Sequence, residues 1–407
     1  MRQVRFAARA LSALFAVALS LLPDCSCDNL GRIALSAPQS GGGRQFIDAE
    51  QRQRFFHGIN AVVKGPPWIP AAAAFDAQTS LCDYDMQLLQ SLGVNVIRLG
   101  VMWPAVEPAE GVYNDMYLEA VASIVTNAAS HGIYTLLDMH QDSLSELFCG
   151  EGVPAWALLH MRDVLPLPEP IGPRFNDSDY ESDSCGIPGC RWPTRQACAA
   201  HSWGSMQFSD ACGQGYSELW HTGGSDFERS LLFKWASVLA HVAAYFKNFT
   251  SVLGLEIVNE PFPGNVFRDP LLLLPGWADA HVLQAAYNLA VPVIRKSNED
   301  ILIFFAGTTW SDLGDGFVQV PGGADYSNRS VLAFHYYEPP QVGLQRSPSP
   351  ALPANTRVLA CRSRRARGST FAGSLPWPSS FRCGCHAAPA LPPPANQNNV
   401  FQRRKCN

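Results

Sequence analysis

Short apolar runs alternate with longer segments of helical periodicity between about residues 55 and 337. The apolar runs predict six strands, at Phe56–Val63, Asn95–Gly100, Tyr134–His140, Val252–Asn259, Ile301–Gly307 and Val331–Tyr337. Near-continuous apolar strands of this kind are typical of a parallel sheet that is buried on both faces. Apolar residues at helical spacing predict helices at Cys82–Leu92, Met116–Ala129, Ser230–Phe246 and His281–Arg295. The repeated strand–helix order predicts an α/β fold with parallel strands.

Polar side chains stand at the C-terminal ends of the predicted strands. They are Asn60, Arg98, His140 with Asp142, Asn259 with Glu260, Trp310, and His335 with Tyr337. Alone, Arg98 could be an ordinary ion-pair partner and His140 a core histidine. Their repetition at successive strand ends favours a shared site, because the strand C-termini of a TIM (β/α)8 barrel form its catalytic face. We therefore expect a TIM barrel over residues 50–340.

The predicted barrel is incomplete, because strands 7 and 8 are not recognisable. After Glu338 the sequence contains no Asp and no Glu, and residues 341–407 are basic and rich in proline. Such composition is typical of a disordered tail. A barrel without two of its strands would expose sheet edges, so we expect the chain to fold poorly when expressed alone.

Three explanations of residues 341–407 are open. The segment could come from a frame error, a retained intron or an alternative end of the gene product. It could be a genuine tail on a binding protein that does not turn over, or the barrel could be completed by another chain. The abrupt change to basic, proline-rich sequence after Glu338 favours the first explanation.

The N-terminal residues predict entry into the secretory pathway. Residues 1–27 have a basic start and an apolar run, Ala10–Leu22, that is too short to span a membrane comfortably, as in a signal peptide. An uncleaved anchor is the alternative. Twelve cysteines and three glycosylation sequons, at Asn176, Asn248 and Asn328, agree with a secreted or lumenal protein.

A long insertion in the third strand–helix unit, residues 161–225, contains Cys185, Cys190, Cys198 and Cys212. Insertions after a barrel strand lie on the catalytic face. The four cysteines and His201 could bind zinc, but paired C-x-x-C spacing is missing, so disulfides are favoured. Cys82 and Cys149 could pair locally or with this insertion.

Asn259-Glu260-Pro261 carries the candidate chemistry. Retaining glycosidases use one carboxyl group as acid/base and a second as nucleophile, about 5–5.5 Å apart. Glu260 follows a buried strand and precedes Pro261, which ends strand pairing, so it fits the acid/base role. Asn259 can bond the sugar 2-hydroxyl. Carboxylates alone perform this reaction, so neither a metal nor another cofactor is expected. A formal net charge of −5 and a pI of about 6.1 do not suggest a nucleic-acid partner.

Several motifs extend this pattern over residues 54–340. They are Phe56-His57-Gly58-Ile59-Asn60 through Lys64-Gly65-Pro66-Pro67, Asn95–Gly100 with Trp103, Leu137–Asp142, Cys149–Pro154, Asn259–Pro261 and His335–Tyr337. With them the sequence resembles glycoside hydrolase family 5, and specifically its endoglycoceramidase branch. The His-Gln-Asp and Cys-Gly-Glu-Gly-x-Pro stretches are the motifs most specific to that branch.

The resemblance implies hydrolysis of the bond between oligosaccharide and ceramide in glycosphingolipids. Expected partners are a glycolipid or oligosaccharide and a membrane surface. The cleft would need an apolar side for the lipid, and Leu271–Leu274 with Trp277 are candidates for it unless that loop simply packs on the barrel or begins a helix. The implied roles are acid/base for Glu260, 2-hydroxyl binding for Asn259, positioning of the nucleophile for Arg98, glycan contact for Lys64, His140 and Asp142, and support of the nucleophile and sugar for His335 and Tyr337.

The nucleophile is the departure from the family pattern. The family's second Glu ends strand 7, and this sequence has none there. Glu338 would lie one strand too early, and nothing in the sequence promotes Glu151 or Asp142 to the role. Two alternative functions follow, namely a β-glucanase type of polysaccharide hydrolase and an inactive glycolipid-binding pseudoenzyme.

Overall fold

A computed structural model describes residues 30–39, 43–161, 176–184, 191–200, 203–310, 315–336 and 360–361. The predicted signal peptide and almost all of residues 341–407 lie outside these ranges. None of the helices within them is long and apolar enough to cross a lipid bilayer.

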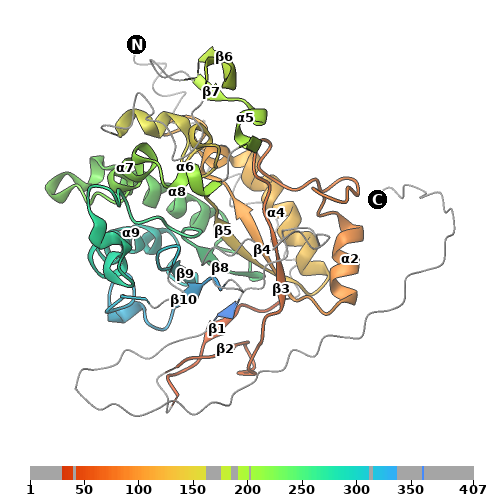
Figure 1. Cartoon of the computed structure of the whole chain (residues 1–407). Coiled ribbons are helices and arrows are strands. Elements are labelled where there is room, and N and C mark those ends of the chain that lie inside the picture. The colour runs from red at the N-terminus through yellow and green to blue at the C-terminus, as the bar shows by residue number, and fades with distance from the viewer. Residues whose placement is uncertain are drawn as a thin grey trace, which may run out of the picture.

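Six parallel strands form the centre of the molecule (Figure 1), as the sequence predicts. They are β3 (Gly58–Ala61), β4 (Val96–Val101), β5 (Tyr134–Met139), β8 (Val252–Glu256), β9 (Ile303–Ala306) and β10 (Ser330–Phe334). They pair in this order, and a two-residue strand, β11 (Ala360–Cys361), pairs antiparallel with β10. The sheet supplies six strands of a TIM barrel.

Burial differs between the central and the outer parallel strands. Every residue of β4, β5, β8 and β9 is buried, which explains their near-continuous apolar sequence. β10 alternates between half-buried and buried residues, and most of β3 is half-buried. The outer strands therefore pack less completely than the central four.

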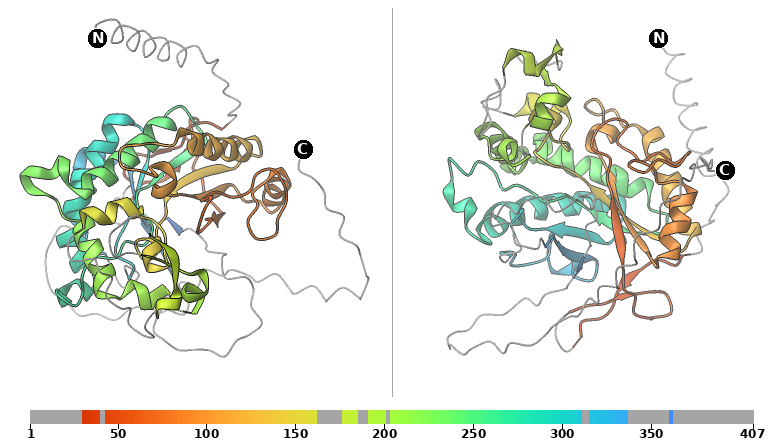
Figure 2. Two further views of the ribbon diagram at one scale, coloured as in Figure 1. Left: turned by 90° about the horizontal axis from the view of Figure 1, so that it is seen from above. Right: turned by 45° about the vertical axis from the view of Figure 1, so that its right-hand side comes forward.

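Helices flank the sheet on its outside (Figure 2). The four predicted helices are present as α2 (Asp83–Ser91), α4 (Asp115–Ser130), α8 (Leu231–Tyr245) and α9 (Gln284–Ser297), and a short α3 spans Trp103–Val106. The Asn114 and Ser230 side chains accept the backbone N–H of Tyr117 and of Phe233, the third residues of α4 and α8, which fixes where those helices begin. The fourth helix begins later than predicted, because a π-helical turn, Asp279–Leu283, precedes α9.

Short 3-10 helices lie in the connecting loops. They span Glu146–Phe148, Ala155–His160, Asp177–Asp179, Gly224–Arg229, Pro270–Leu273 and Ala324–Tyr326.

An N-terminal hairpin, β1 (Ala34–Leu35) with β2 (Phe46–Ile47), covers the N-terminal ends of the parallel strands. The Phe46 ring stacks on Phe304 of β9 at 6.1 Å and meets Phe56 edge-on at 5.3 Å. The insertion lies at the opposite end of the molecule (Figure 1). One end of the sheet is thus sealed by apolar packing, and the other is left for polar groups.

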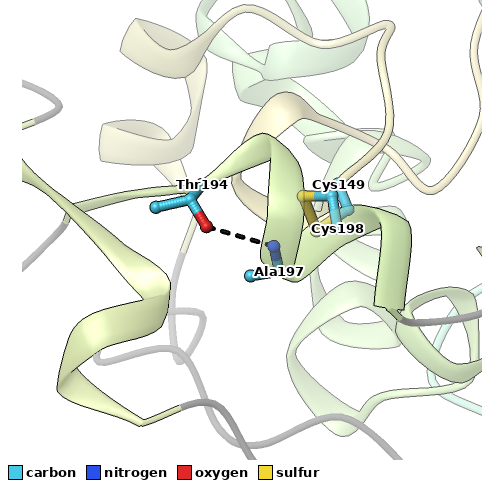
Figure 3. The surroundings of a disulfide bond; sticks show 4 residues. All are labelled: Cys149, Thr194, Ala197 and Cys198. Atoms are coloured by element: carbon cyan, nitrogen blue, oxygen red, sulfur yellow. Dashed lines mark hydrogen bonds between the residues drawn. A yellow bond between two sulfur atoms is a disulfide. The ribbon is translucent and has the colours of Figure 1, made fainter.

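The insertion folds into a two-stranded sheet and short helices. These are β6 (Tyr180–Ser184), β7 (Arg191–Pro193), α5 (Arg195–Ala200), α6 (Trp203–Gln207) and α7 (Asp210–Leu219). Cys149 forms a disulfide with Cys198 of α5 (Figure 3), so of the two alternatives for Cys149 the pairing with the insertion is the one observed. Cys82 is disulfide-bonded too.

The disulfide prediction is wrong for Cys212, which is a buried free thiol. Cys212 lies in α7 against the hydrophobic core, where it packs as a small apolar side chain. The predicted roles of Cys185, Cys190 and His201 fall outside the described residues. Because Cys198 is bonded to Cys149, its sulfur cannot serve the alternative zinc site.

Candidate active site

Three ionisable side chains stand inside otherwise apolar strands. Arg98 lies in the middle of β4, Asp138 is the penultimate residue of β5, and Glu256 is the last residue of β8. Arg98 is 1% exposed, and the other two are fully buried. Buried charges must be paired, so these residues have to meet across the sheet.

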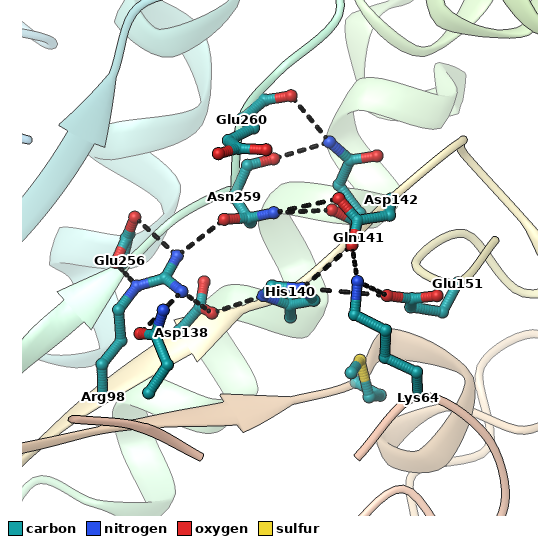
Figure 4. A network of polar contacts seen from close by, with 12 residues as sticks. Lys64, Arg98, Asp138, His140, Gln141, Asp142, Glu151, Glu256, Asn259 and Glu260 are labelled. Carbon is teal, nitrogen blue, oxygen red and sulfur yellow. Dashed lines mark hydrogen bonds and ion pairs between the residues drawn. The ribbon is translucent and has the colours of Figure 1, made fainter. Parts of the chain in front are cut away.

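Arg98 contacts both of these buried carboxylates and lies at the centre of the network (Figure 4). Its Nε and Nη2 donate to the two carboxylate oxygens of Glu256 at 2.6 and 2.9 Å, and Nη1 contacts Asp138 Oδ2 at 2.8 Å. Nη2 also donates to Asn259 Oδ1 at 2.9 Å. Burial opposes the charge of Glu256, yet Arg98 outweighs it and holds the pKa of that carboxyl at about 2. Arg98 and Glu256 therefore form a permanent ion pair beneath the site.

His140 extends the network beyond the end of β5. Its Nδ1 bonds Asp138 Oδ2 at 2.7 Å, and its Nε2 lies 3.5 Å from Asp142 Oδ2 and 3.7 Å from Glu151 Oε1. Burial alone would lower the pKa of His140, but the Asp138 carboxylate outweighs it and raises the pKa to about 9. The imidazole is therefore protonated at neutral pH.

The loop after β5 brings Asp142 and Glu151 side by side through an antiparallel bridge. Gly150 is required there, because a Cβ on it would lie 1.8 Å from the Asp142 carbonyl oxygen. Lys64, from the loop after β3, forms ion pairs with both carboxylates and lies 3.2 Å from Glu151 Oε1. Burial raises the pKa of Glu151 to about 7, whereas His140 and Lys64 overcome the effect of burial and lower that of Asp142.

His140, Asp142 and Glu151 have the composition of a metal site, since one ligand atom from each lies within 4.8 Å of the others. They do not fit a metal ion as they stand. The Lys64 ammonium already pairs with both carboxylates and occupies the place of a cation between them. The cluster presents donors and acceptors suited to hydroxyl groups.

Glu260 lies in the loop beyond β8. The predicted strand Val252–Asn259 ends earlier, at Glu256, because the pairing with β9 stops there and Glu260 has a positive φ of 39°. Few non-glycine residues adopt that conformation, and it costs of order 1–3 kcal/mol unless its surroundings fix it. The Glu260 carbonyl oxygen accepts from Gln141 Nε2 at 2.9 Å and from Thr309 Oγ1 at 3.1 Å.

The Glu260 carboxylate is bonded to His335, the first residue after β10. His335 Nδ1 lies 2.6 Å from Glu260 Oε1, and Nε2 lies 3.8 Å from Glu256 Oε1. Burial would lower the pKa of His335, but Glu256 and Glu260 outweigh it and raise the pKa. The His335 imidazole therefore stays protonated to a higher pH than a free imidazole would.

The structure gathers seven of the eight predicted site residues at one end of the sheet, and Tyr337 lies outside the described residues. The seven are Lys64, Arg98, His140, Asp142, Asn259, Glu260 and His335. Sequence reasoning gave no role to Asp138, Gln141 or Glu256. A carboxylate inside an apolar strand was the available signal for Asp138 and Glu256, because such a group demands a buried cation.

Among the residues that the structure describes, we assign no carboxylate as the nucleophile. Glu256 contacts His335, but it is fully buried and bonded through both oxygens to Arg98, so it cannot reach a sugar carbon. Asp142 and Glu151 are paired with Lys64. Glu338 lies outside the described residues.

His140 predicts a pH dependence of stability. Its pKa of about 9 in the folded chain exceeds its ordinary value of 6.5, so its contribution is complete below pH 6.5 and is lost as the pH rises through 9. We expect the unfolding free energy to fall by up to about 3 kcal/mol over this window, and by clearly less in His140→Asn. Urea unfolding at pH 6, 7.5 and 9 measures both. Equal pH slopes in the two proteins would contradict the assignment.

Comparison with known proteins identifies the family of the chain. The sequence model of the family described as Cellulase (glycosyl hydrolase family 5) matches residues 75–365. This chain is similar to two proteins named endoglycoceramidase. The one from Hydra vulgaris is 44% identical over 294 residues, and the one from Cyanea nozakii is 42% identical over 299 residues. These alignments include 72% and 73% of this chain but 54% and 56% of the relatives. The chain thus spans about half the length of the relatives it matches.

Solved structures share the fold. Endo-glycoceramidase II from Rhodococcus sp., in complex with a five-membered iminocyclitol, superimposes with a TM-score of 0.53 at 23% identity, over 72% of this chain and 58% of that chain. Its complex with ganglioside GM3 gives a TM-score of 0.53 over the same shares of the two chains. With the family match over residues 75–365, these findings establish that the chain belongs to glycosyl hydrolase family 5 and has its TIM-barrel fold.

Proposed function

We propose that the protein is a retaining glycosidase that hydrolyses the bond between oligosaccharide and ceramide in glycosphingolipids, with Glu260 as acid/base. The observation that carries the proposal is the Glu260–His335 pair, 2.6 Å apart, beside a cluster of hydrogen-bonding groups at the strand C-termini. The similarity to proteins named endoglycoceramidase supports this substrate.

The surroundings of Glu260 suit a neutral sugar. Asn259 is held by Arg98 at Oδ1 and by the Gln141 carbonyl at Nδ2, at 2.8 Å. Its second N–H has only a 3.5 Å contact with Asp142 and is available to a sugar 2-hydroxyl. Lys64, Asp142 and Glu151 offer charged donors and acceptors, which bond hydroxyl groups strongly. We place the sugar at the scissile bond between these groups.

Product stereochemistry tests the proposal. The 407-residue chain is incubated with fluorescent GM3 and, separately, with dinitrophenyl β-lactoside, with and without sodium azide. Release of β-lactose without azide supports a retaining enzyme with its own nucleophile. An α-glycosyl azide released from GM3 only with azide shows that the acid/base half works alone: azide attacks the anomeric carbon as the bond to the protonated ceramide oxygen breaks. An α-lactosyl azide from the dinitrophenyl substrate alone shows that the sugar binds productively, because dinitrophenolate leaves without a proton. None of these products, together with no binding of the glycolipid, would overturn the proposal.

Hydrolysis of a polysaccharide is the second candidate, because the matching family model is described as a cellulase. Product analysis separates the two functions. Free ceramide from GM3 supports the glycolipid substrate, whereas oligosaccharides from a β-glucan, without ceramide release, support the polysaccharide. Binding of GM3 without either product would support a pseudoenzyme.

We also propose that the loop after Glu260 contacts a membrane surface. Four apolar side chains there are about half exposed, at 47–53%, namely Phe267, Leu271, Leu273 and Leu274, while Leu272 is buried. We expect Leu273→Asp with Leu274→Asp to reduce binding to vesicles of phosphatidylcholine and GM3 at least about fivefold, because burying a charge beside lipid is costly. Co-sedimentation measures this, and the exposed Val318→Asp is the control. Unchanged binding of the double variant would contradict the contact.

Passage through the secretory pathway remains our proposal for location. The disulfide between Cys149 and Cys198 and the surface exposure of the three sequon residues Asn176, Asn248 and Asn328 support it. A mass decrease on peptide-N-glycosidase treatment of the chain made in animal cells would agree. A chain found only in the cytosol and without glycans would not.

A further inference from the structure

Helix α7 of the insertion is hydrogen-bonded to the loop that follows Glu260. Trp220, at the end of α7, donates its Nε1 proton to the Phe262 carbonyl oxygen at 2.8 Å. Ser217 Oγ accepts from the Asn265 backbone N–H at 2.9 Å, and Asn265 Nδ2 donates to Asp210 Oδ1 at 2.9 Å. The insertion thus supports the acid/base loop from outside the barrel.

Tyr216 of α7 reaches further, toward Glu260 itself. Its buried hydroxyl oxygen accepts the Leu144 backbone N–H at 2.9 Å and donates its own proton to Gln141 Oε1. A hydroxyl has one proton, and a backbone N–H can only donate. The Leu144 N–H occupies one lone pair of the hydroxyl and leaves its proton for Gln141 Oε1, so the bonds run from Leu144 to Tyr216 to Gln141.

The Tyr216 bond holds the Gln141 amide in the one orientation that suits its partners on the other side. With Oε1 facing Tyr216, Nε2 faces the carbonyl oxygens of Asn259 and Glu260, at 2.6 and 2.9 Å. A turned amide would set its oxygen against two carbonyl oxygens, which cannot donate. The bond from Gln141 is one of the contacts that hold Glu260 in its positive-φ conformation.

We propose that Tyr216 is a positioning residue for Glu260, acting through the orientation of the Gln141 side chain. The cysteine-containing insertion thereby takes part in aiming the proton donor as well as shaping the approach of substrate. The role of Glu260 as the donor rests on the proposed function, whereas the orientation of Gln141 does not.

Hydrogen exchange tests the positioning without any need for turnover. In Tyr216→Phe we expect the backbone amides of residues 257–268 to exchange at least about tenfold faster, since Gln141 loses the bond that orients it. Tyr117→Phe is the matched control, because Tyr117 also accepts a backbone N–H, from Met102 at 3.3 Å, and donates to a carbonyl, that of Trp68 at 2.9 Å. It should leave residues 257–268 unchanged. Equal effects of the two variants, or none in Tyr216→Phe, would overturn the proposal.

Ligand affinity separates positioning from loss of packing. A cellobiose-like imidazole carries a basic nitrogen that takes a proton from a well-placed acid, whereas cellobiose gains nothing from that proton. We expect the ratio of the two affinities to fall at least about tenfold in Tyr216→Phe and to stay constant in Tyr117→Phe. A constant ratio in both variants would overturn the role in aiming the acid. If the unsubstituted chain binds neither ligand, the proposed function fails, and hydrogen exchange still decides whether Tyr216 orients the loop.

Discussion

Replacing Glu260 by Gln should reduce the rate of ceramide release from GM3 by about 10²–10⁴-fold, because Gln cannot protonate the leaving oxygen. Dinitrophenolate is a far better leaving group and needs no proton. The same substitution should therefore reduce cleavage of dinitrophenyl β-lactoside much less. If the chain requires added azide, both rates are measured with azide present.

The control for Glu260→Gln is Glu299→Gln, since Glu299 pairs with Arg329 on the surface, where its side chain is 75% exposed. It should leave both rates unchanged. Equal losses on the two substrates in Glu260→Gln would argue for a damaged fold and against an acid. A full rate on GM3 would exclude Glu260 as the proton donor.

Replacing Arg98 by Ala should lower the free energy of unfolding more than any other substitution proposed here. It leaves Glu256 and Asp138 fully buried without their shared cation, and breaking a buried pair in this way costs about 3–5 kcal/mol. We expect the urea midpoint to fall sharply or the variant to accumulate as insoluble protein. Adding Glu256→Gln to Arg98→Ala should recover part of the loss, because it removes one of the two uncompensated charges.

Arg52→Ala is the control for Arg98, because Arg52 pairs with Asp48 and Glu50 but is 67% exposed. Surface pairs contribute little, so the midpoint should hardly move. An Arg98→Ala protein with the midpoint of the unsubstituted chain would mean that the buried network is not a stabilising unit.

The regular parts of the barrel were accessible from sequence. Strands such as β5 and β8 are buried on both faces, so their apolar runs are long and unambiguous, and α4 and α8 keep a helical spacing of apolar residues. The π-helical turn before α9 was missed, since its apolar spacing resembles that of an α-helix. The end of β8 was placed three residues late, because Ile257 and Val258 are apolar and buried although they lie beyond the strand.

The sequence predicts which strand ends contribute to the site, but it does not predict the hydrogen bonds and ion pairs that connect the site residues. Seven residues could be named because parallel strands end at one face of a barrel. The partnership of Arg98 with Glu256 depends on β4 and β8 lying on either side of β5 in the sheet, information that no local pattern contains. Gln141 illustrates the same limit. It stands between two predicted residues, His140 and Asp142, and its importance appears only when its amide is seen between Tyr216 and Glu260.

The backbone at Glu260 has an evolutionary consequence. Glycine or asparagine would adopt φ 39° at a lower free-energy cost than glutamate. A protein selected only for thermal stability should therefore tend to lose Glu260. In a laboratory selection for heat resistance alone, substitutions at position 260 should rise in frequency. A parallel selection for release of ceramide should hold the position fixed. The backbone conformation at position 260 thus identifies a residue at which selection for stability and selection for activity favour different amino acids.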